Sequence, residues 1–255
     1  MQAVRWAALV ACILGVLWSS PAQAGQRPFI WTFDTDIVPK GDVELEQWLW
    51  ARSRAPGAPE RPSAYWLWWA PVLGMSQHLE LAIPFQVRAT RGLTELDSFE
   101  ADVRYRLFPR GDDRPFQPLI RAVWHQSVRG SSPSRVDLNL VGSYQWEGGL
   151  RVALDLGTQV GIPGLRGSDA PVRILGTYSA GASYPLIADE LRVSVESFGE
   201  FGLKELDHDP RLFVGPSVAW TFGRMWLTAG TLVGLTFASS DTPRFMPRLI
   251  WAVAL

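Results

Sequence analysis

Apolar and polar side chains alternate along most of this chain from about residue 42 onward. In the stretch 77–88 (QHLELAIPFQVR), every second residue from Leu79 to Val87 is apolar, and polar residues occupy several of the positions between. The stretch 99–107 (FEADVRYRL) repeats this arrangement and places four ionisable side chains on one face: Glu100, Asp102, Arg104 and Arg106. Successive side chains of a β-strand point to opposite faces, so a period of two predicts strands rather than helices.

The same test identifies twelve strand segments of 10 to 16 residues each. They are 42–53, 62–73, 77–90, 95–108, 115–128, 134–147, 149–162, 170–184, 190–205, 210–222, 224–238 and 246–255. Strands of globular proteins are about half this long, whereas a tilted strand needs roughly 9 to 11 residues to cross the hydrocarbon of a membrane. The lengths therefore favour membrane-spanning strands, and their number is even, as is usual for bacterial barrels.

The connections between these segments alternate in type. Short turns such as 74–76 and 148 follow the even-numbered segments, and pieces rich in Pro, Ser and Gly such as 129–134 and 163–170 follow most of the odd-numbered ones. Outer-membrane barrels have short periplasmic turns and longer outward loops. The sequence thus predicts an all-β fold, a closed antiparallel transmembrane β-barrel of about 12 strands with short periplasmic turns. The loop at 91–94 is shorter than this pattern favours.

Tryptophan residues occur near the ends of several segments, on the face expected to meet lipid: Trp124, Trp146, Trp220 and Trp251. Such residues form girdles at the two membrane interfaces. The last segment ends in RLIWAVAL, and this alternation up to the terminus is similar to the closing strand that the barrel-insertion machinery recognises. Leu255 departs from the usual terminal aromatic residue.

Three strands cannot be phased from the sequence, namely the first, the second and the eleventh. In the second (64–73, AYWLWWAPVL) both faces are apolar, and its tryptophans could cover part of the N-terminal segment. Residues 25–41 (GQRPFIWTFDTDIVPKG) show no clear period. We assign them as an N-terminal periplasmic segment that precedes a barrel of residues 42–255, although the segment could instead tuck into the barrel.

Residues 1–24 are typical of a cleaved secretory signal peptide. A basic residue, Arg5, precedes an apolar run and the triplet Ala22-Gln23-Ala24, so cleavage is expected after Ala24. The sequence Leu9-Val10-Ala11-Cys12 could alternatively be a lipoprotein box, which would leave a short apolar core. Cleavage after Ala24 would remove Cys12, which is the one cysteine of the chain, and the mature protein would have no disulfide.

The net charge of the mature chain is close to zero and indicates no particular class of binding partner. Removal of Arg5 from the 24 basic residues leaves 23 against 25 acidic residues. This balance gives no reason to expect nucleic-acid binding, and no motif indicates a cofactor or a metal. We expect the partners to be outer-membrane lipid, the insertion machinery and an unidentified small solute, in the outer membrane of a Gram-negative-type bacterium.

The charged faces of the strands are expected to line the lumen, because a charge that faces lipid at mid-bilayer costs roughly 2 to 4 kcal/mol. The expected lining residues are Glu44, Glu46, Glu80, Glu100, Asp102, Arg104, Arg106, Arg121, Asp137, Arg151, Asp155, Arg173, Arg192, Glu196 and Glu200. Acids and bases could neutralise one another and close the interior as a structural barrel, or they could orient small polar solutes in a narrow channel.

Two short patterns resemble those of known barrels. LGMSQHLELAIPF (73–85) is similar to the "G-L-T-D-R-L-E-L…P-F/Y" hairpin of a group of outer-membrane barrels that are uncharacterised or assigned to transport, including those of the phenol-degradation-pathway type. IVPKGDVELEQWLW (37–50) resembles their entry into the first strand. This resemblance implies a barrel and a transport role, without a defined substrate.

A second resemblance concerns WHQSVRGSSPSRVDLN (124–139). His125, Ser127 and Asn139 resemble the catalytic His, Ser and Asn of outer-membrane phospholipase A, which is also a twelve-stranded barrel. The family's following Asn-Gly is replaced by Val128 and Arg129. The strand phase directs His125 and Ser127 toward the lumen, with His125 expected to pair near Leu138. We therefore expect a solvated polar patch and no enzyme, and keep the phospholipase-like hydrolase as an alternative.

Overall fold

The structure is a computed structural model that describes residues 27–53, 64–90, 93–109, 114–128, 134–162, 172–187, 190–204, 210–235 and 243–255. The expected signal peptide, residues 25 and 26, and most of the long connections lie outside the described residues. Among the described residues, no helix is both long enough and apolar enough to cross a membrane.

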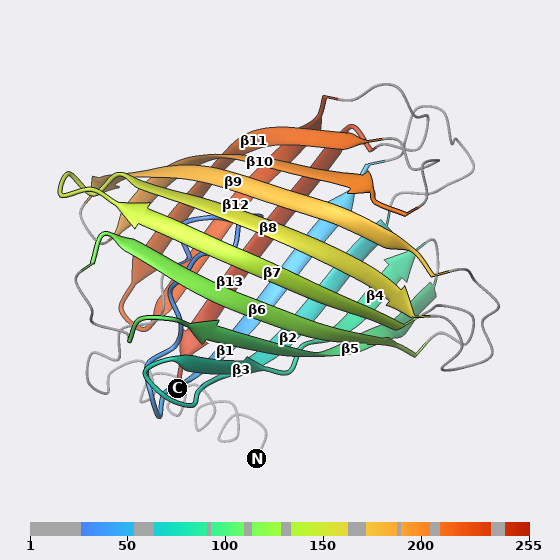
Figure 1. The fold of residues 1–255 in the computed structure, drawn as a ribbon, viewed down its shortest axis with the longest axis horizontal. Helices are drawn as coiled ribbons and strands as arrows, with labels where there is room; N and C mark the ends of the chain where they lie inside the picture. The colour runs from blue at the N-terminus through green and yellow to red at the C-terminus, as the bar shows by residue number, and fades with distance from the viewer. Residues whose placement is uncertain are drawn as a thin grey trace, which may run out of the picture.

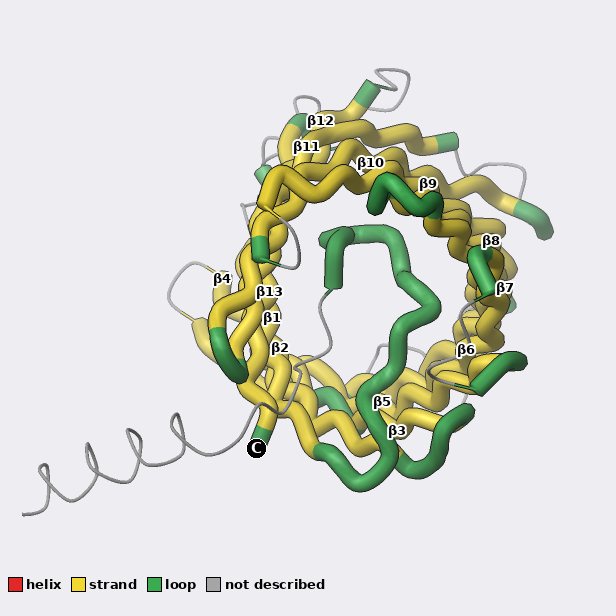
Figure 2. Tube along the Cα trace, turned by 90° about the vertical axis from the view of Figure 1, so that its left-hand side faces the viewer, coloured by secondary structure: helices red, strands yellow, loops and turns green. Residues whose placement is uncertain are grey.

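The described strands form one antiparallel sheet that closes on itself (Figures 1 and 2). Closure occurs because β1 pairs with β2 on one side and with the last strand, β13, on the other. The strands are β1 (Val43–Arg52), β2 (Ala64–Gly74), β3 (Leu79–Ala82), β4 (Phe85–Thr90), β5 (Leu93–Arg106), β6 (Phe116–Ser127), β7 (Ser134–Gln145), β8 (Arg151–Ile162), β9 (Ile174–Ile187), β10 (Leu191–Gly202), β11 (Arg211–Phe222), β12 (Met225–Gly234) and β13 (Phe245–Ala254).

The short strands β3 and β4 together make one strand of the barrel, since both pair with β2 and β5. The interruption falls at Ile83 and Pro84. Proline has no N–H and cannot donate to the ladder, so the regular pairing breaks there. Counted in this way the barrel has twelve strands, as the alternation predicts.

The two ends of the barrel differ. The short connections after β2, β5, β7, β9 and β11 lie at one end, together with the start of β1 and the end of β13; we call this the turn end. The ends of β1, β4, β6, β8, β10 and β12 lie at the opposite end, which we call the loop end (Figure 1). This arrangement matches the alternation of short and long connections along the sequence.

The outer surface of the barrel is apolar. Exposed residues include Leu140, Leu154, Leu156, Val195 and Val218. Trp124, Trp146 and Trp220 are 38%, 45% and 49% exposed, so they lie on the outer surface toward the strand ends, as expected of a girdle.

An arginine on this surface tests its contact with lipid. Leu156→Arg, in the middle of β8, should lower the free energy of unfolding by about 2 to 4 kcal/mol, whereas Leu186→Arg near the end of β9 should cost about 0 to 1 kcal/mol. Urea titration of the protein folded into lipid vesicles would measure both values. Equal costs at the two positions would contradict the predicted membrane depth.

The structure settles the phase of the strands that the sequence left open. Trp66 and Trp68 of β2 point inward and stack on Trp50 and Trp48 of β1, with ring centroids 4.0 and 5.2 Å apart. Trp69 points outward and contacts Phe85, at 5.7 Å. On the eleventh barrel strand, β12, Trp226, Thr228 and Leu232 are buried inside. The inward face of β2 is therefore the one that carries Trp66 and Trp68, and these rings pack on the neighbouring strand β1.

Candidate functional site

The N-terminal residues 27–41, which we call the plug, lie inside the barrel. Figure 2 shows this segment within the ring of strands. The sequence allowed either a periplasmic segment or a segment tucked into the barrel. The structure has the segment tucked into the barrel. The plug joins β1 at the turn end, where Gly41 has a φ of 88° and donates its N–H to the carbonyl of Gly74 at 2.7 Å. A Cβ at Gly74 would lie 1.8 Å from the carbonyl oxygen of Pro39, so glycine is required for the plug to enter.

Glu196 of β10 holds the far bend of the plug. Its carboxylate accepts the backbone N–H groups of Ile30, Trp31 and Thr32 at 2.7, 2.8 and 2.8 Å, and the hydroxyl of Ser217 at 2.6 Å. Irregular backbone at membrane depth is tolerated only where its polar groups find partners inside the protein. Glu196 supplies such partners to three consecutive residues.

This cradle carries a prediction. Glu196→Gln replaces a charged acceptor by a neutral amide, and a hydrogen bond to a charged group contributes about 1.5 to 3 kcal/mol. The amide protons of Ile30, Trp31 and Thr32 should then exchange with solvent about 10- to 100-fold faster, because each 1.4 kcal/mol is a factor of ten. Hydrogen exchange followed by mass spectrometry would measure this. Glu190→Gln, an exposed residue at the turn end, is the control and should leave the exchange unchanged.

Two aromatic residues of the plug are covered by arginines of the barrel wall. The guanidinium of Arg248 lies 3.7 Å from the centre of the Trp31 ring and donates to the carbonyl of Ile30 at 2.9 Å. The guanidinium of Arg121 lies 3.7 Å from the centre of the Phe33 ring. Cation–π contacts that are shielded from water contribute about 2 kcal/mol each. The bend of the plug is therefore held by cation–π contacts to its aromatic rings as well as by hydrogen bonds to its backbone.

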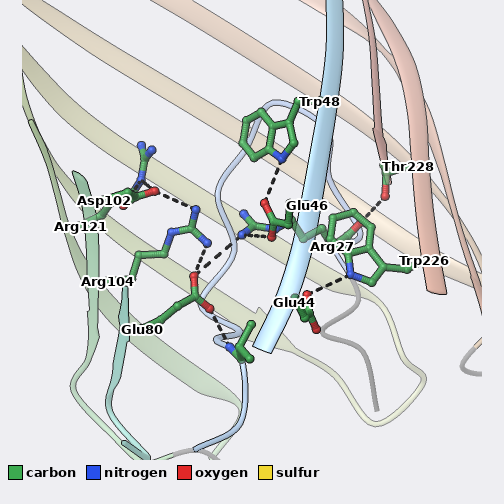
Figure 3. Close-up of polar contacts among 11 residues, drawn as sticks. Arg27, Glu44, Glu46, Trp48, Glu80, Asp102, Arg104, Arg121, Trp226 and Thr228 are labelled. Atoms are coloured by element: carbon green, nitrogen blue, oxygen red, sulfur yellow. Dashed lines mark hydrogen bonds and ion pairs between the residues drawn. The ribbon is translucent and has the colours of Figure 1, made fainter. Parts of the chain in front are cut away.

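A chain of charged side chains crosses β3, β5 and β6 beside the plug (Figure 3). Arg104 bonds Glu80 at 2.5 Å and Asp102 at 2.8 Å, and Asp102 also accepts Nε of Arg121 at 3.0 Å. We call these four residues the charge ladder. Glu80 reaches the plug as well, since it accepts the N–H of Val38 at 2.7 Å. The acids and bases of the ladder thus neutralise one another and also fix the plug.

The start of the plug contacts both β1 and β12 and also lies near the charge ladder, since the Arg27 guanidinium is 3.9 Å from Glu80. The Arg27 guanidinium lies 2.6 Å from the carboxylate of Glu46, which also accepts the indole N–H of Trp48 at 2.9 Å. The hydroxyl of Thr228 donates to the carbonyl of Arg27 at 2.6 Å (Figure 3). The plug therefore runs from the turn end up to the bend at Trp31 and back toward Glu46.

Two acids of the plug share one arginine of β8. Arg151 lies 2.6 Å from the carboxylate of Asp34 and 2.7 Å from that of Asp36. Burial raises the pKa of Asp34 to about 6, although the Arg151 charge acts in the opposite direction. The carboxyl group of Asp34 therefore titrates closer to neutral pH than an exposed aspartate.

The structure places most of the expected lining residues inside the barrel. Those that are buried there are Glu44, Glu46, Glu80, Glu100, Asp102, Arg104, Arg106, Arg121, Asp137, Asp155, Arg192 and Glu196. Arg151 contacts the plug, and Glu200 pairs with Arg211 at 2.7 Å. Arg173 differs, because it lies exposed just before β9 at the loop end. Whether these residues line a pathway for solutes stays a prediction.

Sequence reasoning allowed the segment to tuck into the barrel, but it assigned no role to the individual plug residues and missed their anchors Arg248 and Thr228. The plug has no period that would indicate a strand or a helix. Its dense mixture of aromatic and acidic residues, PFIWTFDTDI at 28–37, was the available signal, because such a segment would not stay exposed to water.

His125, Ser127 and Asn139 do not form a catalytic group. His125 lies opposite Arg135, and Asn139 lies opposite Arg121, four positions further along the ladder or about 14 Å away at 3.4 Å per residue. The expected pairing of His125 near Leu138 is wrong, because directly opposite residues share a face of the sheet, and Leu138 is 53% exposed on the outer face.

Each of the three has another partner. The Nδ1 atom of His125 lies 2.8 Å from Glu100, Ser127 donates to the carbonyl of Asp97 at 3.4 Å, and the amide of Asn139 donates to Asp155 at 2.7 Å. A serine nucleophile needs a base within hydrogen-bond reach. The inward direction of His125 and Ser127 matches the strand phase, but the geometry gives no support to the phospholipase alternative.

A cavity lies on the loop-end side of the plug, with about 390 Å³ of space between atoms, part of which is open to solvent. Trp31 and Phe33 of the plug and Phe198 of β10 form its aromatic side, and residues of β6 to β9 form its polar side. We call this the upper cavity. Within the described ranges, no group of three or more His, Cys, Asp or Glu side chains is arranged to hold a metal ion.

No protein-family model matches the sequence, and no curated protein matches it either. Solved structures with a similar fold include outer-membrane porins and an outer-membrane channel. The NanC porin aligns with a TM-score of 0.62 over 83% of this chain and 100% of its own, at 11% identity. The COG4313 outer membrane channel from Pseudomonas putida F1 aligns at 0.59 over 87% and 98%, with 12% identity.

The KdgM porin aligns with a TM-score of 0.56 over 83% of this chain and 99% of its own, at 9% identity. These matches give no support to the local resemblances to phenol-degradation-pathway-type barrels and to outer-membrane phospholipase A. At such low identities the similarity establishes the fold. The chain is a closed antiparallel β-barrel of twelve strands, the fold found in these outer-membrane channels.

Proposed function

We propose that this protein is a narrow outer-membrane channel for small solutes, in which the plug obstructs the turn-end half of the lumen. The observation that carries this proposal is the way the plug is held. It is continuous with the barrel only at Asp42, and elsewhere it is bound by hydrogen bonds and ion pairs to side chains such as Glu46, Glu80, Ser143, Glu196 and Arg248. Contacts of this kind can break and form again, so they permit the plug to move.

The interior of the barrel supports a polar pathway. Charged residues of both signs face inward, while the outer surface is apolar. In pores, rings and rows of charged side chains select the solutes that pass. The same proposal includes three further steps. The protein is exported as a precursor, the barrel-insertion machinery recognises its last strand, and the turn end lies in the periplasm.

A closed structural barrel is the second candidate. It is favoured by the neutralised charge ladder and by the buried ion pairs of the plug, since buried pairs of this kind often serve to fix one conformation. Single-channel recording in planar lipid bilayers, together with solute uptake into liposomes, separates the two candidates. Conducting events or uptake by the wild-type protein support the channel, and their absence in both assays favours the closed barrel.

A further inference from the structure

The upper cavity contains one buried carboxylate that differs from the others. Asp155 of β8 is 4% exposed and lines the cavity opposite Ser179 of β9. One oxygen of Asp155 accepts the side-chain amide of Asn139 at 2.7 Å. Among the described residues it forms no ion pair with a basic side chain. Its hydrogen-bond donor is thus a neutral amide, and the positive charge of Arg121 acts on it through space without a direct ion pair.

The other inward acids near the cavity each have a basic partner. Glu100 lies 2.8 Å from His125, and Asp137 lies 2.7 Å from Arg135. The guanidinium of Arg121, which also lines the cavity, is bound through Nε to Asp102 at 3.0 Å. A buried charge without a partner is costly, so Asp155 is suited to receive a cation from outside the protein.

The groups around Asp155 supply further acceptors. Thr177 and Ser179 carry hydroxyls on the cavity wall, and the Asn139 amide oxygen remains available because its nitrogen is the atom bound to Asp155. Gly157 allows these groups to approach, since a Cβ there would lie 2.5 Å from both Asn139 Nδ2 and Thr177 Oγ1. An ammonium group offers three donors and a positive charge, which matches a carboxylate surrounded by oxygen acceptors.

We propose that the upper cavity is a binding site for small organic cations that carry a primary ammonium group, with Asp155 as the counter-ion. The aromatic side of the cavity, at Phe33 and Phe198, receives the apolar part of such a solute. This inference names the solute class of the proposed channel and rests on that function for its physiological meaning. Binding itself does not require that the channel conducts, so it is measured separately.

The test uses the full-length barrel in detergent and propylammonium as the probe. Saturation-transfer NMR titration gives its affinity, with propanol and propionate as neutral and anionic probes of similar size. Propylammonium should bind in a saturable way and propionate should not. Asp155→Asn keeps the size of the side chain and removes its charge, and it should weaken propylammonium binding at least tenfold. Glu147→Gln, an exposed residue at the turn end, is the matched control and should bind as the wild type does.

A second variant separates the site from general loss of structure. Gly157→Ala forces Asn139 and Thr177 apart without a change of charge, and it should also weaken binding. The folded state of each variant is checked by the heat-dependent shift of its electrophoretic mobility. Equal affinity of folded Asp155→Asn and wild type, or equal binding of propionate and propylammonium, overturns the proposal. An absence of both bilayer conductance and liposome uptake counts against the channel and leaves the binding result standing.

Discussion

Removal of residues 27–38 should raise the single-channel conductance of the protein several-fold. The plug crosses the lumen from the charge ladder on one side to Glu196 and Thr228 on the other, so its backbone and rings occupy the route a solute would take. Without it, the inward charges of β5, β6 and β10 would line a water-filled passage. Rows of such charges support ion conduction in other pores.

The deletion is designed to keep the barrel intact. It retains Pro39 to Asp42, so that the left-handed turn at Gly41 and its bond to Gly74 are preserved. In the deletion variant Glu80 still pairs with Arg104, and Glu196 still accepts the hydroxyl of Ser217. Water can donate to the carboxylate oxygens that the plug leaves. Planar-bilayer recordings of the deletion and the wild type at the same salt concentration measure the effect. Unchanged conductance of a folded deletion variant would show that the plug is not the obstruction.

The barrel could be predicted from the sequence because lipid imposes a simple rule on every strand. A charge on the lipid side is costly, so Asp102, Arg104 and their neighbours reveal the inward face wherever charges alternate with apolar residues. The rule gives no answer for β2, where the residues on both faces are apolar. There the outcome depends on neighbours in space, since Trp66 and Trp68 stack on tryptophans of β1.

The candidate site was less predictable because its contacts join distant parts of the chain. Ile30 and Glu196 are 166 positions apart, and no local pattern links them. The register of β6 against β7 shows a different limit. Strand phase correctly predicted that His125 faces inward. The residue directly opposite His125 on β7 must face inward as well, and Leu138 faces outward. Applied to both strands at once, the alternation excludes that pairing and permits Arg135.

A cysteine pair that joins the plug to the barrel should abolish conductance until it is reduced. The hydroxyl oxygens of Thr35 on the plug and Ser143 on β7 lie 2.5 Å apart, and both residues are buried. Side chains this close fit the spacing of about 3.5 to 4.5 Å that a disulfide requires between its β-carbons. The chain has one cysteine, Cys12, within the expected signal peptide, so Thr35→Cys with Ser143→Cys introduces a single pair into the mature protein.

In the oxidised double variant the plug is bound covalently at its middle as well as at Asp42, and any opening that requires its displacement is blocked. Conductance and liposome uptake should therefore be absent before addition of a reductant and reach the wild-type level afterwards. Thr35→Cys and Ser143→Cys alone are the controls, because each removes one of the two hydroxyls without forming the disulfide and should be insensitive to reductant. Equal conductance of the oxidised and reduced double variant would mean that solutes pass beside a fixed plug, in which case the space between the plug and β6 to β9 is the pathway.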